Sequence, residues 1–213
     1  MAGRGRPRAF DRTAALRRAM ELFWERGYEG ASLSDLTAAM GIHPPSLYAA
    51  FDCKEELFKE AVAYYNATTG AAPQRALAQA PTARAAIEAV LRHNARVYVE
   101  PGHPSGCMVT LAATGGPIEN EEVRRFLAAC RRSDLDELRQ RIERGVAEGD
   151  VPPDTDCAKL ARFVAAVMHG MSLQARDGAD QIALEQVVDC AMAAWDRLVT
   201  DSRAGRGATD GIT

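Results

Sequence analysis

Apolar residues recur at intervals of three and four along nearly the whole of this chain, and no stretch sustains the alternation that a strand requires. A period near 3.6 residues places such side chains on one face of a helix. With 213 residues, 47% of them hydrophobic and 26% charged, the chain can bury a core and lacks the composition of a disordered protein. We therefore expect an all-α fold.

Capping residues and glycines divide the N-terminal part into short helices. Gly27 and Gly41 are suitable left-handed helix ends, and Ser32 is a suitable N-cap. Asp52 with Glu55 has the spacing of a capping box that opens a further helix. The predicted helices span residues 12–26, 33–40, 45–51 and 52–68.

The rest of the chain predicts a larger helical unit after a joint. Residues 70–81 are rich in Ala, Pro and Gln, which favours a connection between two units. Residues 202–213 carry no periodicity and are predicted to form a frayed tail. The helices expected between them span residues 82–99, 105–113, 119–148, 156–176 and 183–201.

Two short helices joined by a turn that contains Gly41 predict a helix-turn-helix, whose second helix can enter the major groove of DNA. Leu47 and Phe51, four residues apart, would anchor this helix inward. Lys54 and Ser32 each combine a polar side chain with a helix N-terminus, which attracts phosphate. The residues expected to face DNA from this unit are Ser32, His43, Pro44, Pro45, Ser46, Tyr48 and Lys54. The alternative is that Tyr48 and Lys54 are ordinary surface residues.

The N-terminal arm, residues 1–9, supplies a local basic patch. The chain as a whole has a formal charge of -3, so it is no polybasic coat, yet its first 18 residues hold six arginines and one aspartate. Arg4, Arg6 and Arg8 of the arm can follow phosphates or enter the minor groove. The alternative is a solvated basic tail without DNA contacts.

Residues 31–57, ASLSDLTAAMGIHPPSLYAAFDCKEEL, resemble the DNA-binding domain of TetR-type transcriptional regulators. The likeness rests on an apolar first helix followed by Gly27-Tyr28, then on Leu-Tyr-x-x-Phe and Lys-Glu-Glu-Leu-Phe. Pro44-Pro45 differs from the small or charged residues that the family often has there. The resemblance implies a homodimer of all-α subunits that binds operator DNA through residues 10–60. It also implies a second domain, residues 61–201, that binds a small effector and dimerises.

Residues 70–213 contain no recognisable catalytic motif, neither His-Glu-x-x-His nor Gly-x-Ser-x-Gly nor a phosphate loop. An enzyme is therefore disfavoured, and its best case is a Cys107 nucleophile near His103. A helical scaffold and a helix-turn-helix activator are further alternatives to a repressor that an effector releases from a palindromic operator.

Cys107 is predicted in the first turn of the short helix 105–113, where the helix dipole favours a thiolate. A redox or electrophile sensor is therefore one interpretation, and a buried packing residue is the other. The five cysteines are odd in number and form no Cys-x-x-Cys, which indicates reduced thiols and neither a metal site nor a cofactor. Without a secretory signal or a membrane span, we expect the chain in the cytoplasm.

Two further surfaces are expected in the second domain. A cavity among helices 82–99, 105–113, 119–148 and 156–176 would hold a largely apolar effector, and its predicted lining is Cys107, Met108, Phe126, Phe163 and His169. The broad apolar faces of the last two helices predict a four-helix dimer interface. Its expected residues are Val167, Met171, Val188, Ala191, Met192 and Trp195.

Overall fold

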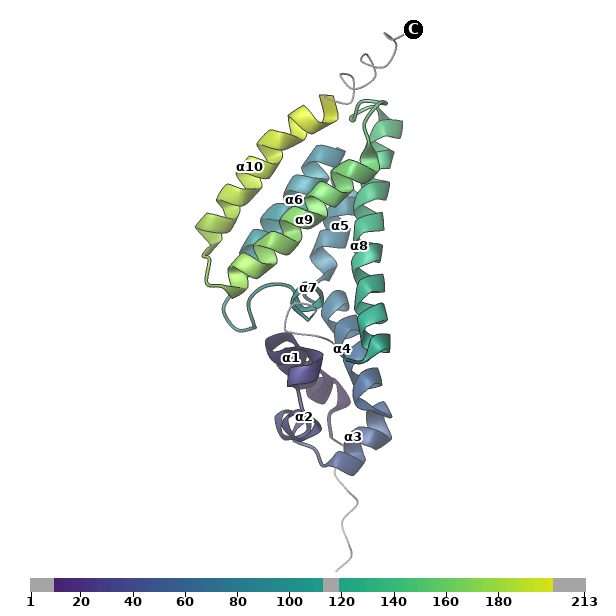
Figure 1. Cartoon of the computed structure of the whole chain (residues 1–213), viewed down its shortest axis with the longest axis vertical. Coiled ribbons are helices and arrows are strands. Elements are labelled where there is room, and N and C mark those ends of the chain that lie inside the picture. Colours follow the sequence, from purple (N-terminus) through teal and green to yellow (C-terminus); the bar gives the residue numbers. More distant parts are fainter. Residues whose placement is uncertain (1–9, 113–118, 201–213) are drawn as a thin grey trace, which may run out of the picture.

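The computed structural model describes residues 10–112 and 119–200, and every regular element in these ranges is a helix (Figure 1). The all-α prediction is confirmed. The elements are α1 (Arg12–Gly30), α2 (Leu33–Met40), α3 (Pro44–Phe51), α4 (Lys54–Ala67), α5 (Ala71–Gln79), α6 (Ala83–Val97), α7 (Met108–Leu111), α8 (Glu121–Glu148), α9 (Cys157–Arg176) and α10 (Gln181–Thr200). The predicted arm and the predicted tail lie outside the described residues.

The helices form an elongated molecule with a small unit at one end (Figure 1). Helices α1 to α3 gather at that end, α5, α6, α9 and α10 lie at the other, and α8 runs alongside. Two apolar cores fill these regions, and Cys107 packs against both of them. The first core also includes Met108 and Val109 of α7 and Val123 and Leu127 of α8. The small unit is therefore packed directly onto the second unit.

Helix α1 continues past the predicted end at residue 26. Asp11 caps its start, because the carboxylate accepts hydrogen bonds from the amides of Thr13 and Ala14, both at 3.0 Å. Gly27 has φ 71° and interrupts the helix, as a left-handed residue does, but a last turn follows as far as Gly30. That turn brings Tyr28 into the core, where its ring packs edge-on against Phe58 at 5.2 Å between centroids.

The helix-turn-helix follows the sequence prediction closely. Ser32 is the N-cap of α2, as expected, and forms a capping box with Asp35, and Gly41 ends α2 in the left-handed conformation with φ 68°. Helix α3 begins at Pro44, one residue earlier than predicted, since proline fits either of the first two positions. Leu47 is fully buried. The second helix of the motif is therefore fixed to the core by its inward face.

The predicted capping box of Asp52 and Glu55 is wrong. Asp52 has φ 59° and ends α3, where its backbone amide donates to the carbonyl of Tyr48 at 3.0 Å. Cys53 is the N-cap of α4, and its Sγ accepts a hydrogen bond from the amide of Glu56 at 3.5 Å. The connection between α3 and α4 is only two residues long, so Asp52 ends the first helix and Cys53 caps the second.

The predicted joint at residues 70–81 contains helix α5. Ala, Gln, Arg and Leu have high helix propensity, and Pro73 lies in the first turn, where it interrupts no helical hydrogen bond. Two arginines of α8 hold the far end of α5, since Arg144 donates to the carbonyl of Ala78 at 3.2 Å and Arg141 to that of Ala80 at 3.1 Å. The domain boundary expected between residues 60 and 61 falls inside α4.

Helix α7 is shorter than the predicted helix 105–113, and Cys107 is its N-cap rather than a first-turn residue. Gly106 has φ 82° and its amide donates to the carbonyl of Tyr98 at 2.8 Å. The amide of Cys107 donates to Ser172 Oγ, also at 2.8 Å. These two bonds fix the backbone at Cys107 between α6 and α9.

The last three long helices start close to their predicted positions, α8 at Glu121, α9 at Cys157 and α10 at Gln181. Asn120 and Asp156 cap the first two through their side-chain oxygens, which accept from the third residue beyond. In the described part of the chain, no helix has the length and apolar character needed to cross a membrane.

Candidate DNA-binding surface and ligand pocket

The outer face of the helix-turn-helix presents the side chains that the sequence predicts there. His43, Pro44 and Pro45 are exposed, Tyr48 is 47% exposed and Ser46 is half-buried. A shallow hollow between α2 and α3 is lined by Leu33, Ser34, Thr37, Pro44, Leu47 and Tyr48. This face lies at the free end of the small unit (Figure 1), so a DNA groove can reach it.

Ser32 uses its hydroxyl group within the fold. Its Oγ accepts from the amide of Asp35 at 3.1 Å and donates to the Asp35 carboxylate at 2.6 Å. These hydrogen bonds lower the pKa of Asp35, and Arg26 lies 3.5 Å from the same carboxylate. Because a charged carboxylate already occupies this helix start, a phosphate contact by Ser32 remains a prediction that competes with its capping role.

Lys54 stands at the N-terminus of α4 with its ammonium 4.3 Å above the ring of Tyr28. The side chain is half-buried, and this burial lowers the pKa of Lys54, while nearby Glu29 acts in the opposite direction. The cation is thus held at the base of the helix-turn-helix by a cation–π contact. A fixed ammonium beside free helix amides is a suitable phosphate ligand.

Arg12, one of the six N-terminal arginines, stabilises the small unit instead of extending into solvent. Its guanidinium lies 2.7 Å from the Glu60 carboxylate, 4.4 Å from the centre of the Phe51 ring and 3.1 Å from the carbonyl of Ala50. Arg12 therefore ties α1 to α3 and α4. Arg4, Arg6 and Arg8 lie outside the described residues, and their DNA contacts stay a prediction.

Replacing Lys54 by alanine is expected to weaken binding to all DNA sequences about equally. Loss of one phosphate contact reduces the slope of log affinity against log salt concentration by roughly one unit. Fluorescence anisotropy over a salt series measures this slope. His43→Ala is the matched comparison, because a base-reading side chain should alter the preferred sequence with the slope unchanged. An unchanged slope in folded Lys54→Ala would remove Lys54 from the phosphate contacts.

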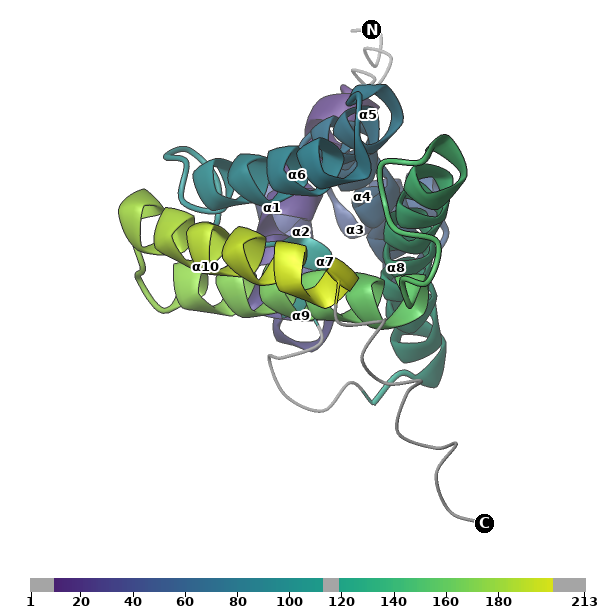
Figure 2. The ribbon, with the colours of Figure 1, turned by 90° about the horizontal axis from the view of Figure 1, so that it is seen from above.

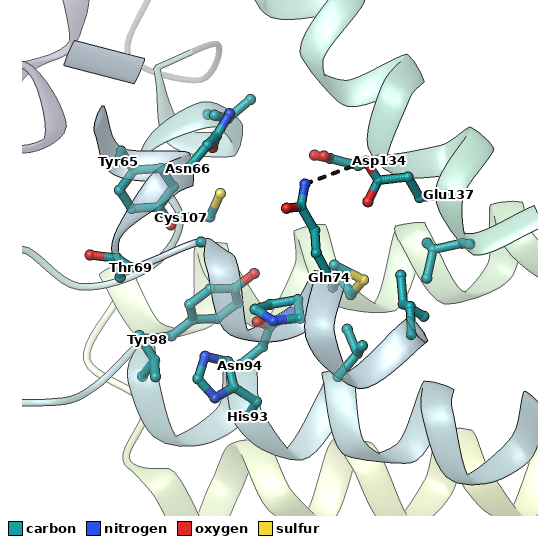
Figure 3. A pocket seen from close by; sticks show the side chains of 18 residues that line it. Tyr65, Asn66, Thr69, Gln74, His93, Asn94, Tyr98, Cys107, Asp134 and Glu137 are labelled. Atoms are coloured by element: carbon teal, nitrogen blue, oxygen red, sulfur yellow. Dashed lines mark hydrogen bonds between the residues drawn. The ribbon is translucent and has the colours of Figure 1, made fainter. Parts of the chain in front are cut away.

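A pocket of about 90 Å³, open to solvent on one side, lies among helices α4 to α9 (Figure 3). Helices α6, α7, α8 and α9 contribute to it, as the sequence suggests, and α4 and α5 contribute as well. Its walls are formed by Tyr65, Asn66, Thr69, Gly70, Pro73, Gln74, Leu77, Val90, His93, Asn94, Val97, Tyr98, Cys107, Val109, Asp134, Glu137, Leu138 and Met168.

Of the predicted lining residues, only Cys107 lies in the wall of this pocket. Met108 is fully buried in the first core. Phe126 packs toward Phe58, with 6.5 Å between ring centroids. Phe163 and His169 are half-buried on α9 but do not reach this pocket. Residues of α4 and of α5, a helix that the sequence does not predict, form part of the pocket wall. Effector contacts by Met108, Phe126, Phe163 and His169 stay a prediction.

The wall around Cys107 carries two tyrosines. Tyr65 of α4 and Tyr98, which ends α6, are each 5% exposed, and burial raises the pKa of both. The Tyr65 side chain contacts the Cys107 thiol, which adds to the increase in its pKa. Both phenols are therefore neutral at physiological pH and can donate hydrogen bonds.

The opposite wall carries carboxyl groups from α8 (Figure 3). Burial raises the pKa of Asp134 to about 6, the nearby Glu137 raises it further, and Arg131 opposes this change. Burial also raises the pKa of Glu137, whose carboxylate accepts a hydrogen bond from Gln74 at 3.4 Å. No group of three or more His, Cys, Asp or Glu side chains in the described ranges is arranged to hold a metal ion.

The predicted dimer-interface residues lie almost entirely inside the subunit. Met171 and Val188 are fully buried, and Ala191, Met192 and Trp195 are 4–6% exposed in the isolated chain. Only Val167 is half-buried. These side chains pack α9 and α10 against α6 and each other, so they hold the subunit together. Residues so deeply buried in one chain have little surface left for a second.

The outward faces of α9 and α10 nevertheless carry several small and apolar residues. The two helices lie side by side in both views (Figures 1 and 2). The exposed or half-buried residues on these faces are Ala166, Val167, Gly170, Leu173, Ile182, Cys190 and Ala193. Small side chains allow two helices to approach closely, which suits a helix-on-helix interface.

Several hydrogen bonds join the small unit to the second one. The Glu29 carboxylate accepts from the backbone amides of Glu119 and Asn120 at 3.0 and 3.3 Å, just before α8. Arg176, at the end of α9, donates to the carbonyl of Trp24 at 2.9 Å. A change in the helices around the pocket can therefore reach the DNA-binding end through packed elements.

An exposed helix-turn-helix joined to a helical unit with an internal pocket defines the class of one-chain transcriptional regulators that contain a ligand domain. Comparisons with known proteins give the family. Residues 15–61 match the bacterial regulatory proteins of the tetR family, and residues 81–191 match the tetracyclin repressor-like C-terminal domain. The chain belongs to the TetR family of transcriptional regulators.

Individual relatives agree with this assignment. The chain is 35% identical over 202 residues to the transcriptional repressor ComR of Escherichia coli (strain K12), covering 92% of this chain and 94% of ComR. It is 30% identical over 191 residues to the repressor BdcR of the same organism, covering 89% of each. A structure of the TetR family regulator CifR, a cysteine mutant complexed with 26-bp operator DNA, is 48% identical with a TM-score of 0.86, covering 90% of this chain and 100% of CifR.

Proposed function

We propose that this protein is a dimeric repressor, acting in the cytoplasm, that binds a palindromic operator and is released from it by a small molecule. The observation that carries the proposal is that α4 belongs to both sites. Its first residue, Lys54, lies at the DNA-facing end, and Tyr65 and Asn66 in its last turns line the pocket. A ligand that moves α4 therefore moves the helix-turn-helix packed on it.

The outward face of α9 and α10 supports the dimeric part of the proposal. A two-fold dimer formed through this face is a four-helix arrangement in which each subunit presents the same patch. Two-fold symmetry places the two α3 helices for successive major grooves, about 34 Å apart, on a palindromic site. ComR and BdcR carry the name of repressors and CifR is complexed with operator DNA, which supports the direction of control.

Selecting bound fragments from the host genome and footprinting them tests this proposal. We expect protection with two-fold symmetry over a palindrome, and the genes beside the site indicate the effector. Protection without symmetry, or no selected fragment, would contradict a dimeric operator-binding protein. A transcription assay with the selected promoter distinguishes repression from activation.

Effector control has a thermodynamic signature. A ligand releases the protein only by binding the DNA-incompetent state more tightly than the competent one. By reciprocity, operator DNA must weaken ligand binding by the same factor by which the ligand weakens operator binding. Calorimetric titration of a candidate with and without operator measures that factor. Equal ligand affinities in both titrations would exclude that candidate as the inducer.

A second proposed function is sensing of electrophiles or oxidants by Cys107, since its thiol lies in the pocket wall against Tyr65. With an activated alkene, the sulfur bonds to the β-carbon, the π electron pair moves toward the carbonyl, and the thiol proton ends on the α-carbon. The covalently filled pocket would then act on α4 as a bound effector does.

Brief treatment of the folded protein with N-ethylmaleimide is expected to label Cys107 and to reduce operator affinity about tenfold or more. Cys53 lies beside Lys54 and Cys190 lies on the outward face of α10, and both are exposed, so the treated protein carries Cys53→Ser and Cys190→Ser. The control is the same protein with Cys107→Ser in addition, which should keep its operator affinity after the same treatment. Peptide mass spectrometry identifies the labelled sites. Loss of operator binding in treated Cys107→Ser would transfer the effect to another cysteine.

We propose no catalytic function. His103, the base considered for a Cys107 nucleophile, stacks its ring on Trp24 at 4.8 Å between centroids, and its Nδ1 lies 3.0 Å from the carbonyl of Pro104. Among the described residues no hydrogen bond joins His103 to Cys107. The geometry supports a packing role for His103.

A further inference from the structure

The charges that line the pocket are distributed unevenly. Asp134 and Glu137 stand three residues apart on α8, so that both carboxyl groups face the same side. No lysine or arginine is among the described residues that line the pocket. His93 faces the cavity from α6, and burial lowers its pKa, so its ring is neutral at physiological pH. The lining is therefore anionic.

Asp134 is the carboxylate that is available to a ligand. Glu137 already accepts the hydrogen bond from Gln74, whereas Asp134 has no hydrogen-bond partner among the described residues. Solvent reaches Asp134, yet the surrounding pocket walls desolvate it enough to raise its pKa to about 6. Asp134 is also part of the pocket wall, so its carboxyl group lies beside the space that a ligand would occupy. At neutral pH it is mostly ionised and incompletely compensated.

A second, independent observation marks the same pocket as a binding site. Asn94 of α6 is only 4% exposed, and its Nδ2 has no hydrogen-bond partner among the described residues. A buried amide donor without a partner is costly and calls for an acceptor in the pocket. Leu77, Val90 and Met168 add apolar side chains to the pocket lining.

Three arginines act on groups of the pocket lining but are not part of the lining themselves. Arg131 donates to the carbonyl of Val109 at 3.3 Å, and it lowers the pKa of Asp134 without overcoming the effect of burial. Arg96 lies 3.3 Å from Nδ1 of His93, and Arg75 also acts on that ring. Because none of the three lines the pocket, an anionic ligand would meet two carboxyl groups without a cation beside it.

We infer that the pocket takes a compact organic cation, whose ammonium group pairs with Asp134 and whose hydrogen-bond acceptor and apolar body lie toward Asn94 and the α6 side (Figure 3). The inference rests on the proposed function, because this cation is then the effector class. Charge pairing in a partly desolvated pocket gives selectivity over a neutral compound of the same shape.

Three probes of one shape test the charge requirement, namely 2-phenoxyethylammonium, 2-phenoxyethanol and phenoxyacetate. Each has an aromatic ring and an ether acceptor, and they differ in charge. Calorimetry on the full chain should give affinities in the order cation, alcohol, carboxylate, with the cation favoured about tenfold over the alcohol. Asp134→Asn should remove that advantage. The matched control is Asp136→Asn, an exposed residue on the same helix that pairs with Arg139 and should change nothing.

The pH dependence provides a second readout. Lowering the pH from about 7.5 to about 5 protonates Asp134, whose pKa is about 6, while the ammonium probe stays charged, so the affinity for the cation falls. The affinity for the alcohol should change little. In Asp134→Asn the difference between the two pH values should disappear.

Equal affinities for cation and alcohol, tighter binding of phenoxyacetate, or no detectable binding of the cation would each overturn the inference. Operator binding of the same unliganded preparations separates this failure from that of the proposed function. If operator is bound and the alcohol or the carboxylate binds best, only the ligand class is wrong. If no operator is bound at any salt concentration, the repressor proposal fails, whichever probe occupies the pocket.

Discussion

Replacing Ala193 by glutamate is expected to leave each subunit folded, to separate the dimer into monomers and to reduce operator affinity about 100-fold or more. Ala193 is exposed on the outward face of α10, near Cys190 of the same helix. In an isologous interface each substitution occurs twice, and burying an unpaired charge costs several kcal/mol. The loss of affinity follows because a monomer contacts only one half-site.

The matched variant is Ala191→Glu, two residues away on the same helix. Ala191 is 6% exposed and packs in the core of its own subunit, so a carboxylate there should unfold the chain rather than merely separate the dimer. Circular dichroism reports the fold and analytical ultracentrifugation the association state. A dimeric Ala193→Glu at micromolar concentration would show that this face of α10 is not the interface. A folded, monomeric Ala191→Glu would show that the sequence prediction for Ala191 was right.

This pair shows what the periodicity of α10 can and cannot predict. The helix is apolar over a broad arc, and the sequence predicts that arc correctly as buried or paired. The periodicity does not show which part of the arc packs within the same subunit and which part contacts a second subunit. The sequence predicts that Ala191, Met192 and Trp195 contact the partner subunit. In the structure these side chains fill the core of their own subunit. The packing of α10 against α6 and α9 determines which part of the apolar arc is buried within the subunit.

The helix-turn-helix was predictable because its sequence signals are local. Ser32, Gly41 and the prolines at the start of α3 determine helix ends through backbone conformation and caps, which depend on neighbours in sequence. The inward position of Leu47 follows from helical spacing alone. Where one residue served two helices, at Asp52 and Cys53, the sequence rule chose the wrong cap.

The pocket was only partly predictable because its walls come from six helices. Cys107 could be singled out by the glycine and proline residues around it, and it does lie in the wall. Tyr65 and Asn94 carried no signal, since a tyrosine or an asparagine on a helix usually caps or packs. Helix α5 was the decisive omission, because Gln74 and Leu77 from it close the side of the cavity that faces Asp134.

Gly106→Ala is expected to reduce the free energy of unfolding by about 2–5 kcal/mol. Gly106 has φ 82°, a conformation that costs an L-residue about 1–2 kcal/mol. A Cβ atom here would also lie 2.6 Å from the backbone oxygen of Ser172 and 2.6 Å from a methyl group of Leu111. Relieving that overlap requires a shift of the backbone, which costs about 1–3 kcal/mol more.

Gly102→Ala is the matched control, because Gly102 has φ 103° but a Cβ atom there would meet nothing within 4 Å. It should lose only the conformational part, about 1–2 kcal/mol. Urea unfolding of both variants measures the difference, and equal losses would mean that the contact with Ser172 yields easily. The displaced backbone segment also includes Cys107, whose amide donates a hydrogen bond to Ser172 Oγ. Gly106→Ala should therefore alter the pocket wall as well, while Gly102→Ala leaves it intact.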